Sequence, residues 1–383
     1  MIVGIPKETF PDEKRVALVP QGAASLTKAG FEVFVEAGAG DKSGFSDSEY
    51  TDKGAKIVEK RKDLFNKADI IMQVRGFGAN IDNGKPDLKL VKQNHLVIGL
   101  HNPLSSIDAM KELAGRKATV FAMELIPRIT KAQSMDTLSS MATIAGYKAV
   151  LLAAETLPKM FPMLMTAAGT VSPARVFVVG AGVAGLQAIA TAKRLGAVVK
   201  AYDVRDAVKE QIESLGAKFV ELPVEAKDAE DSGGYAKEMD EAFYQRQREM
   251  MAKVLAESDV VITTASIPGK KAPILITADM VKGMPKDSVI VDLAAENGGN
   301  CELTEPGKTV VKNEVVIIGP ANIPSDIPYH ASQMYSKNVI TFLLYIIKEG
   351  KLREDMDDEI LAGTMVTKDG EIVHPNVKKI AGS

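Results

Sequence analysis

The stretch that decides the fold is "ARVFVVGAGVAGLQAIATAKRLGAVVKAYDVR", Ala174–Arg205. An apolar run leads into Gly180, Gly182 and Gly185, spaced as G-x-G-x-x-G, and a helix pattern follows at once. In such a turn the first glycine permits tight backbone geometry, the second lets a ligand approach the backbone, and the third lets the helix pack on the strand. The start of the helix also presents N–H groups that favour phosphate. We therefore predict a dinucleotide site at this turn.

An acidic residue completes the motif. Asp203 ends the next apolar run, eighteen residues after Gly185, where a carboxylate accepts hydrogen bonds from ribose hydroxyls. A 2′-phosphate would be repelled there, so we predict NAD(H) rather than NADP(H), although Arg205 could soften the repulsion. The predicted cofactor contacts also include Val183 and Ala184 at the start of the helix. A fold of this kind that binds nothing is the alternative, but the ordered strand, turn, helix, strand and acid favour a working site.

Strand and helix patterns alternate on both sides of this motif, which is typical of parallel sheets covered on both faces. From the motif onward we predict six strands: Arg175–Val179, Val198–Tyr202, Lys218–Leu222, Val260–Thr264, Val289–Asp292 and Val315–Ile318. Before it we predict five: Ile2–Pro6, Phe31–Glu36, Ala68–Val74, His95–Leu100 and Ala118–Met123. The fold class is therefore α/β, with two doubly wound, Rossmann-like domains.

The length of 383 residues also favours two domains. One long helix, which we expect to begin at Ser134 as N-cap with Asp136 in its first turn, leads into the second domain. After "GPANIPSDIP" the chain becomes helical and no seventh strand is evident, so we expect it to return to the first domain. The predicted domains are residues 1–138 with 328–383, and residues 139–327 with a mobile loop near 226–240.

Composition excludes several classes of protein. The net charge of −3, with Lys and Arg spread evenly, gives no sign of a nucleic-acid surface. One cysteine rules out an internal disulfide, and four histidines without ligand-like spacing argue against a metal. The most apolar late run, Val339–Gly350, is about half the ~20 residues that span a bilayer. We predict a cytoplasmic protein without a membrane span of its own.

Two polar segments are ambiguous by themselves. In "PRITKAQSMD", Pro127–Asp136, spacing alone favours an ion pair between Arg128 and Asp136 at the helix end, with Gln133 in solvent. In "SGGYAKEM", composition alone favours a solvated surface loop. Loops of this length are nevertheless often lids, so both interpretations stay open.

With these motifs in place, the chain resembles the NAD(H)-binding domain I of the proton-translocating nicotinamide nucleotide transhydrogenases, of the kind made as a separate alpha-1 polypeptide. The resemblance covers essentially the whole chain. It is carried by "GIPKE", "RVALVP", "MELIPRITKAQSMD", "MTAAGTV", "GVAGLQAIATAKRLGA", "GGYAKEM", "ITTASIPGKKAP", "DLAAENGGNCELTEPG" and "DGEIVHP". It implies an alanine-dehydrogenase-like arrangement of the two domains.

The resemblance also implies roles for individual residues. Arg128, Asp136 and Ser139 would hold the carboxamide end of NAD(H), and Gln133 would bridge toward a second nucleotide. These four would be the catalytic residues. Further cofactor contacts would come from the adenosine ribose segment Asp203, Val204 and Arg205, the closing loop with Gly234 and Tyr235, and the pocket residues Gln247 and Ser266.

The activity that the resemblance implies is direct hydride transfer between NAD(H) on this chain and NADP(H) on a partner subunit. Such a transfer needs positioning rather than a general acid or base. One fingerprint and no membrane span imply an NADP(H)-binding partner and a membrane-spanning partner that moves protons. The chain would then be peripheral to the cytoplasmic face of the inner membrane. A homodimer is also implied, with "FPMLMTAAGTVSPARV" as a hairpin, turning at "AAGTVSP", that could reach the second copy.

Two other functions compete with this interpretation. An alanine dehydrogenase would use Arg15 for a substrate carboxylate and His101 as catalyst, but Arg75 replaces its lysine and Glu296 its aspartate. An arginine cannot act as a titrating base. We therefore expect Arg15 to be a structural ion-pair residue and His101 a satisfied core or loop histidine. The second alternative is a non-catalytic NAD(H) sensor. Cys301 is expected to be an inert thiol.

Overall fold

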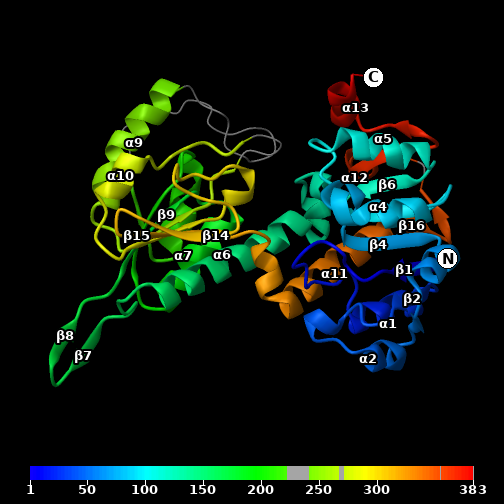
Figure 1. The fold of residues 1–383 in the computed structure, drawn as a ribbon, viewed down its shortest axis with the longest axis horizontal. Helices are drawn as coiled ribbons and strands as arrows, with labels where there is room; N and C mark the ends of the chain where they lie inside the picture. The colour runs from blue at the N-terminus through cyan, green and yellow to red at the C-terminus, as the bar shows by residue number, and fades with distance from the viewer. Residues whose placement is uncertain (222–240, 267–270, 354, 383) are drawn as a thin grey trace. The chain divides into compact units, whose positions relative to one another are not determined.

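The computed structural model describes residues 1–221, 241–266, 271–353 and 355–382. The chain forms two compact units, Met1–Met141 with Pro324–Ser383, and Ala142–Ile323. Each unit is built on one large, mostly parallel sheet with helices packed against it (Figure 1). The predicted α/β class with two doubly wound, Rossmann-like sheets is confirmed.

The sheet of the first unit has the order β19-β18-β6-β5-β4-β1-β2-β3. Its strands are β1 (Ile2–Ile5), β2 (Glu32–Glu36), β3 (Lys56–Val58), β4 (Ile70–Arg75), β5 (Leu96–Leu100), β6 (Thr119–Ala122), β18 (Met365–Lys368) and β19 (Glu371–Ile372). The first six run parallel, and the five strands predicted from sequence are all present. The C-terminal segment adds β18 and β19 as an antiparallel edge.

The helices of the first unit are α1 (Pro20–Lys28), α2 (Asp47–Asp52), α3 (Arg61–Lys67), α4 (Ile81–Leu90), α5 (Ile107–Gly115), α11 (Pro328–Ile346), α12 (Glu359–Thr364) and α13 (Pro375–Ala381). A small hairpin, β16 (Ile347–Lys348) with β17 (Lys351–Leu352), follows α11. The short 3-10 helices of the chain are η1 (Asp41–Ser43), η2 (Phe77–Ala79), η3 (Met123–Leu125), η4 (Thr130–Met135), η5 (Asp206–Val208), η6 (Ala295–Asn297) and η7 (Ile323–Asp326).

The sheet of the second unit has the order β11-β10-β9-β12-β13-β15-β14. Its strands are β9 (Arg175–Val179), β10 (Val198–Tyr202), β11 (Lys218–Phe219), β12 (Val260–Thr263), β13 (Val289–Asp292), β14 (Lys308–Lys312) and β15 (Val315–Gly319). Six strands run parallel in the order typical of a dinucleotide fold, which places β9 and β12 at the topological switch point. The seventh strand, β14, pairs antiparallel with β15, so the expectation of only six strands was wrong.

The helices of the second unit are α7 (Val183–Arg194), α8 (Lys209–Ser214), α9 (Glu241–Leu255) and α10 (Ala278–Lys282). A two-stranded hairpin, β7 (Leu164–Thr166) with β8 (Gly169–Val171), extends away from the sheet of this unit (Figure 1). The predicted hairpin is therefore present, but its turn is formed by Ala167 and Ala168 rather than by the whole of "AAGTVSP".

Helix α6 (Thr137–Thr156) begins in the first unit and continues into the second. The prediction that it starts with Ser134 as N-cap was wrong, because η4 occupies Thr130–Met135 and α6 begins at Thr137. By length and composition α6 could cross a membrane, but the core helices of many proteins pass the same test. Its residues Ala149, Val150 and Ala153 are buried in the core of the second unit, so we interpret it as a core helix.

Candidate functional site

The three glycines of the turn after β9 differ in backbone conformation and in the free space around them. Gly180 has φ +97°, which favours glycine. A Cβ on Gly185 would lie 1.8 Å from the carbonyl oxygen of Gly180, so only glycine allows α7 to pack this closely. A Cβ on Gly182, in contrast, would meet no described atom within 4 Å. Gly182 precedes the first turn of α7, which contains Val183 and Ala184. The turn therefore has open space and a helix start where a pyrophosphate would fit.

Asp203, at the end of β10, is nearly fully buried and accepts four hydrogen bonds. Its Oδ2 accepts from the Ala181 N–H at 2.7 Å and from Arg205 Nη2 at 2.9 Å. Its Oδ1 accepts from the Arg205 N–H and from Arg205 Nε, both at 2.9 Å. Val204 is half-buried between them. Asp203 thus lies beside the glycine turn, as predicted from the spacing. To bond this carboxylate, ribose hydroxyls would have to displace the guanidinium of Arg205 or bind the carboxylate together with it.

The other residues predicted for the adenosine side are only partly described. Gln247 on α9 is buried, and its Nε2 donates to the hydroxyl of Tyr202 at 2.8 Å. Ser266 is exposed in the loop that follows β12. Gly234 and Tyr235, with the mobile loop predicted near 226–240, lie outside the described residues.

The loops around this side of the sheet are held by buried polar residues that were not predicted from the sequence. Asp292, at the end of β13, is fully buried. Its carboxylate accepts hydrogen bonds from five donors, the Oγ1 of Thr263 and of Thr304 and the N–H groups of Ala294, Asn300 and Cys301. Asn300 in turn bonds both the N–H and the C=O of Ala265, next to Ser266. The only feature of the sequence that could have indicated this role is that Asp292 is a polar residue at the end of an apolar strand.

Cys301 belongs to the same buried loop. Its side chain is 1% exposed, and burial raises the pKa of its thiol to about 11. A thiol with such a pKa is almost entirely protonated at neutral pH, which agrees with the expectation that Cys301 is inert. No group of three or more His, Cys, Asp or Glu that could hold a metal occurs in the described ranges.

The segment before α6 forms a small pocket of about 190 Å³ in the first unit. It is lined by Pro127, Arg128, Ile129, Gln133, Asp136 and Ser139, so all four residues predicted to be catalytic lie together. The volume is below the ~300 Å³ of a complete small-molecule site and suits a fragment of a larger ligand. Among these residues Arg128 and Gln133 are exposed.

Asp136 is held in place by the first turn of α6. Its Oδ1 accepts from the Ser139 N–H at 2.8 Å, and its Oδ2 accepts from the Ser139 hydroxyl at 2.6 Å. This arrangement is that of a helix N-cap, which fixes the carboxylate at the pocket wall. The pocket therefore presents a guanidinium, a fixed carboxylate and a primary amide, and a carboxamide can both donate to and accept from such groups.

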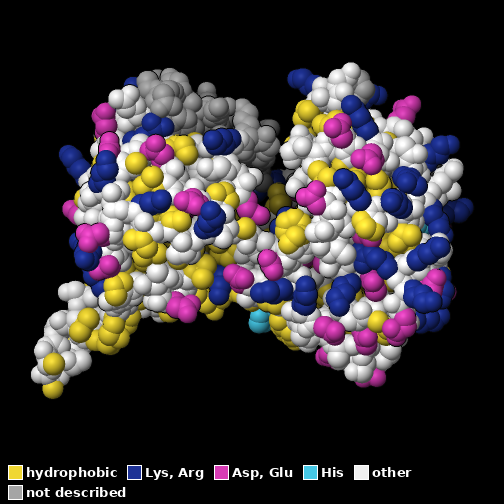
Figure 2. Space-filling model, in the orientation of Figure 1, with side chains coloured by type: hydrophobic (Ala, Val, Ile, Leu, Met, Phe, Trp, Pro, Cys, Tyr) yellow, Lys and Arg dark blue, Asp and Glu magenta, His cyan; other side chains and the backbone are white. Residues whose placement is uncertain are grey.

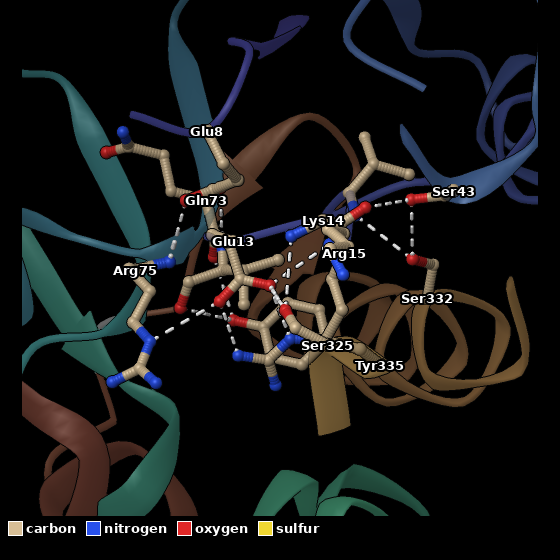
Figure 3. Close-up of polar contacts among 12 residues, drawn as sticks. Glu8, Glu13, Lys14, Arg15, Ser43, Gln73, Arg75, Ser325, Ser332 and Tyr335 are labelled. Atoms are coloured by element: carbon tan, nitrogen blue, oxygen red, sulfur yellow. Dashed lines mark hydrogen bonds and ion pairs between the residues drawn. The ribbon is translucent and has the colours of Figure 1, made fainter. Parts of the chain in front are cut away.

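A second polar cluster lies in the first unit, at the carboxyl ends of β1 and β4 (Figure 3). Arg15 is buried and donates three hydrogen bonds to the Glu13 carboxylate, from Nε to Oε1 at 2.7 Å, from Nη2 to Oε2 at 2.6 Å and from its backbone N–H to Oε1 at 3.0 Å. Arg75 Nε lies 3.4 Å from the same carboxylate. Burial would raise the pKa of Glu13, but the hydrogen bonds and charge of Arg15 hold it at about 2. Arg15 is thus a structural ion-pair residue, as expected, and a substrate carboxylate would compete with Glu13.

The expectation that His101 is a satisfied histidine was wrong. Its ring is fully buried, yet neither ring nitrogen has a hydrogen-bond partner among the residues that the structure describes. Burial lowers the pKa of His101 to about 4. A Cβ on Gly76 would lie 2.1 Å from the ring, so the histidine is packed directly against β4 and the turn after it. His101 is therefore neutral at physiological pH.

Glu8, in the same cluster, gives a pH-dependent stability. Its oxygens accept from the Val74 N–H at 2.6 Å and the Arg75 N–H at 3.1 Å. Burial and the charge of Glu13 raise the pKa of Glu8 from 4.5 to about 8. Between these two values the folded chain binds a proton that the unfolded chain releases, so the free energy of unfolding falls as pH rises. The total loss by about pH 8 is on the order of a few kcal/mol.

Urea unfolding at several pH values between about 5 and 8 tests this prediction. Glu8→Gln keeps the shape of the side chain but cannot titrate, so its stability should fall less steeply with pH than that of the wild-type chain. Burial also raises the pKa of Glu124 to about 7, which leaves a smaller slope of the same sign in the variant. Equal slopes for the two proteins would contradict the assignment to Glu8.

Comparison with known proteins places these features in a family. The alanine dehydrogenase/PNT N-terminal domain matches residues 4–145, and the alanine dehydrogenase/PNT C-terminal domain matches residues 149–375. The chain is 50% identical over 378 residues to the first polypeptide of the NAD(P) transhydrogenase subunit alpha of Rhodospirillum rubrum, covering 98% of each chain. It is also similar to the crystal structure of a transhydrogenase from Sinorhizobium meliloti, with a TM-score of 0.83, 43% identity and coverage of 98% of this chain and 99% of that one.

The alanine dehydrogenase of Bacillus subtilis is more distant, at 29% identity over 392 residues, covering 100% of this chain and 95% of that protein. The resemblance drawn from sequence motifs is thus confirmed, and NAD(H) binding is implied by the family. The chain belongs to the alanine dehydrogenase/PNT family and, within it, to the NAD(P) transhydrogenase alpha subunits, which are oxidoreductases.

Proposed function

We propose that this chain binds NAD(H) and exchanges a hydride directly with NADP(H) held by a partner subunit. The observation that carries this proposal is the pocket in which Arg128, Asp136 and Ser139 lie together with an exposed Gln133. A nicotinamide needs its carboxamide fixed while one ring face stays accessible to the second nucleotide. The name of the relative from Rhodospirillum rubrum describes a subunit alpha that is divided into more than one piece, which supports further subunits.

We assign the nicotinamide half of NAD(H) to this pocket. Arg128 would donate to the carboxamide oxygen, and Asp136, held by Ser139, would accept from the carboxamide nitrogen. Gln133, on the exposed 3-10 turn η4, would reach toward the second nucleotide.

We assign the adenosine half to the glycine turn of the second unit. The open space at Gly182 would receive the pyrophosphate. The ribose would lie against Asp203, Val204 and Arg205, and the remaining contacts would come from Gly180, Val183, Ala184, Gly185, Gly234, Tyr235, Gln247 and Ser266.

Hydride transfer between two nicotinamides requires the protein to orient the rings and does not require it to transfer a proton. A bound NADH supplies the hydride, and direct transfer requires reacting atoms about 3–3.5 Å apart. The groups of the pocket need only hold the ring in place and exclude water. This agrees with a site that offers a fixed carboxylate and a guanidinium, while the neutral His101 lies buried elsewhere.

Assembly extends the proposal beyond the single chain. We propose a homodimer in which the hairpin β7–β8 contacts the second copy. Several apolar side chains on and before this hairpin are exposed, Met163 at 56% and Met165 at 80% among them (Figure 2). Apolar side chains exposed together in this way are typical of interaction surfaces. A membrane-spanning partner would couple the transfer to proton translocation, with this chain peripheral to the cytoplasmic face of the inner membrane.

The role of Gln133 gives a specific prediction. Gln133→Asn shortens the side chain by one methylene, so NADH affinity should stay within about threefold while hydride transfer slows by at least about tenfold. NADH titration by fluorescence and single-turnover transfer with the NADP(H)-binding partner measure the two effects separately. Gln211→Asn, at an exposed position of α8, is the matched control. A large loss of NADH affinity with an unchanged transfer rate would contradict the assigned role.

Isotope labelling tests the proposed reaction itself. With the NADP(H)-binding partner present, deuterium at C4 of NADH should appear at C4 of NADPH without loss to water. An alanine dehydrogenase would instead reduce NAD when alanine is added. A sensor would bind NADH but never transfer the label, even with a partner shown to bind NADP.

A further inference from the structure

We propose that Asn338 and Tyr345, both on α11, are positioning residues for the nicotinamide site. They hold η4, the turn that carries Gln133, at one position before and one position after that residue. This inference rests on the proposed function, because it assigns a role to the order of the pocket described above. Neither residue lines the pocket, and both lie more than two hundred residues from η4 along the chain.

The first anchor lies directly after Gln133. The Nδ2 of Asn338 donates to the carbonyl oxygen of Ser134 at 2.9 Å. Asn338 is only 6% exposed, whereas Ser134 lies at the surface. A buried side chain of α11 therefore fixes the backbone of an otherwise exposed turn.

The second anchor lies two residues before Gln133. The Nζ of Lys131 donates to the hydroxyl of Tyr345 at 2.7 Å and lies 4.8 Å from the centre of its ring. The hydroxyl of Tyr345 donates to the carboxylate of Asp358, which also pairs with Arg353 at 3.2 Å. The guanidinium of Arg353 lies 4.6 Å from the same ring. Tyr345 is thus held between two cations and one anion, and Lys131 is tied to this group.

The turn needs such support for a physical reason. A 3-10 helix has poorer hydrogen-bond geometry than an α-helix and is stable only in short pieces. In η4 only Ala132 and Met135 are buried, so few apolar contacts hold the turn. The anchors at Lys131 and Ser134 therefore set its order, and Gln133 lies between them. A misplacement of about 1 Å in a site that works by orientation costs on the order of 100-fold in rate.

An unpaired buried atom of Asn338 also supports its role as a positioning residue. Its Oδ1 is buried without a hydrogen-bond partner in the described part of the chain. A buried unpaired acceptor costs roughly 1–3 kcal/mol, a cost that is absent for leucine, which has the same branching at Cγ, a larger volume and no polar atoms. Asparagine at this position is better explained by its bond to Ser134 than by global stability. This allows a test in which anchoring and stability change separately.

Asn338→Leu removes the bond to Ser134 and keeps the branching of the side chain. Tyr345→Phe removes the hydroxyl that bonds Lys131, whereas the ring contact of Lys131 and its ion pair with Asp358 at 3.7 Å remain, so this variant weakens the second anchor. Thr341→Ala is the control, because Thr341 is half-buried on the same helix and its hydroxyl donates to the carbonyl oxygen of Lys337 within α11. We expect amide hydrogen exchange of residues 130–135 to rise at least about fivefold in Asn338→Leu, to rise less in Tyr345→Phe, and to stay unchanged in the control. The melting temperature of Asn338→Leu should stay close to that of the wild-type chain, because removal of the unpaired Oδ1 offsets the larger volume of leucine.

The fluorescence of bound NADH measures the effect of these substitutions on the nicotinamide site. Fluorescence anisotropy of saturating NADH should fall in both anchor variants with little change in affinity, and transfer to the partner should slow about tenfold. Unchanged exchange in both variants, or raised exchange with unchanged NADH anisotropy, would overturn the proposal. The exchange and anisotropy measurements need no partner. If the wild-type chain transfers no label, the proposed function fails, whereas these two measurements still decide the positioning role.

Discussion

Gly182→Ala should abolish useful NADH binding and leave the fold intact. Gly182 has φ −72°, which alanine adopts freely, and a Cβ there would meet no described atom within 4 Å. The chain itself therefore accepts the methyl group. If a pyrophosphate occupies that open space, the methyl group displaces it, and overpacking of this kind costs up to about 3 kcal/mol, or about 100-fold in affinity.

Gly185→Ala is the informative counterpart. A Cβ at Gly185 would lie 1.8 Å from the backbone oxygen of Gly180, which no side-chain movement can relieve. The start of α7 must shift, so this variant should be destabilised by about 3 kcal/mol or more. Thermal unfolding and NADH titration of both variants separate the two effects. A Gly182→Ala protein that binds NADH as tightly as the wild-type chain would place the pyrophosphate elsewhere.

Asp292→Ala should destabilise the second unit more than any surface substitution. The variant leaves five donors of the loop after β13 without their acceptor, three of them backbone N–H groups. Each buried unpaired donor costs about 1–3 kcal/mol, and partial solvation limits the total to about 4–5 kcal/mol. We expect this loss in the free energy of unfolding measured with urea.

Two controls define the effect of Asp292. Thr304→Val removes a single donor to the same carboxylate and should cost only about 1 kcal/mol. Asp279→Ala, at a side chain that is 87% exposed, should change stability by less than about 0.5 kcal/mol. If Asp292→Ala were no more destabilising than Thr304→Val, the carboxylate would not hold this loop.

Most of the parallel strands could be predicted from sequence because they are continuous apolar runs between turns, but the three-residue strand β3, with only Val58 buried, was missed. The antiparallel strands at the sheet edges, β14, β18 and β19, were missed for a different reason. Strand β14 is exposed over most of its length, and its turn, Asn313–Glu314 with φ of 52° and 59°, contains no glycine that would indicate a hairpin in the sequence. Strands β18 and β19 flank Asp369–Gly370, also with positive φ, and an Asp-Gly pair is a recognised hairpin signal. The Asp369–Gly370 pair could therefore have predicted the β18–β19 edge of the first sheet.

The candidate site was predictable where its residues are close in sequence. Gln133, Asp136 and Ser139 come from one short segment, and the glycine turn carries its own spacing. The contacts that hold these groups were not predictable, because Asn338 and Ser134 are 204 residues apart. The guanidinium of Arg205 on Asp203 was anticipated only as a softened repulsion, since spacing does not tell where a side chain folds.

A crystal structure of this chain with NADH tests the proposed cofactor site most directly. We predict that the nicotinamide carboxamide bonds Arg128 and Asp136, that the pyrophosphate lies at Gly182, and that Gln133 lies beside the exposed ring face. A nicotinamide ring bound against Arg15 and His101, away from Gln133, would contradict this assignment.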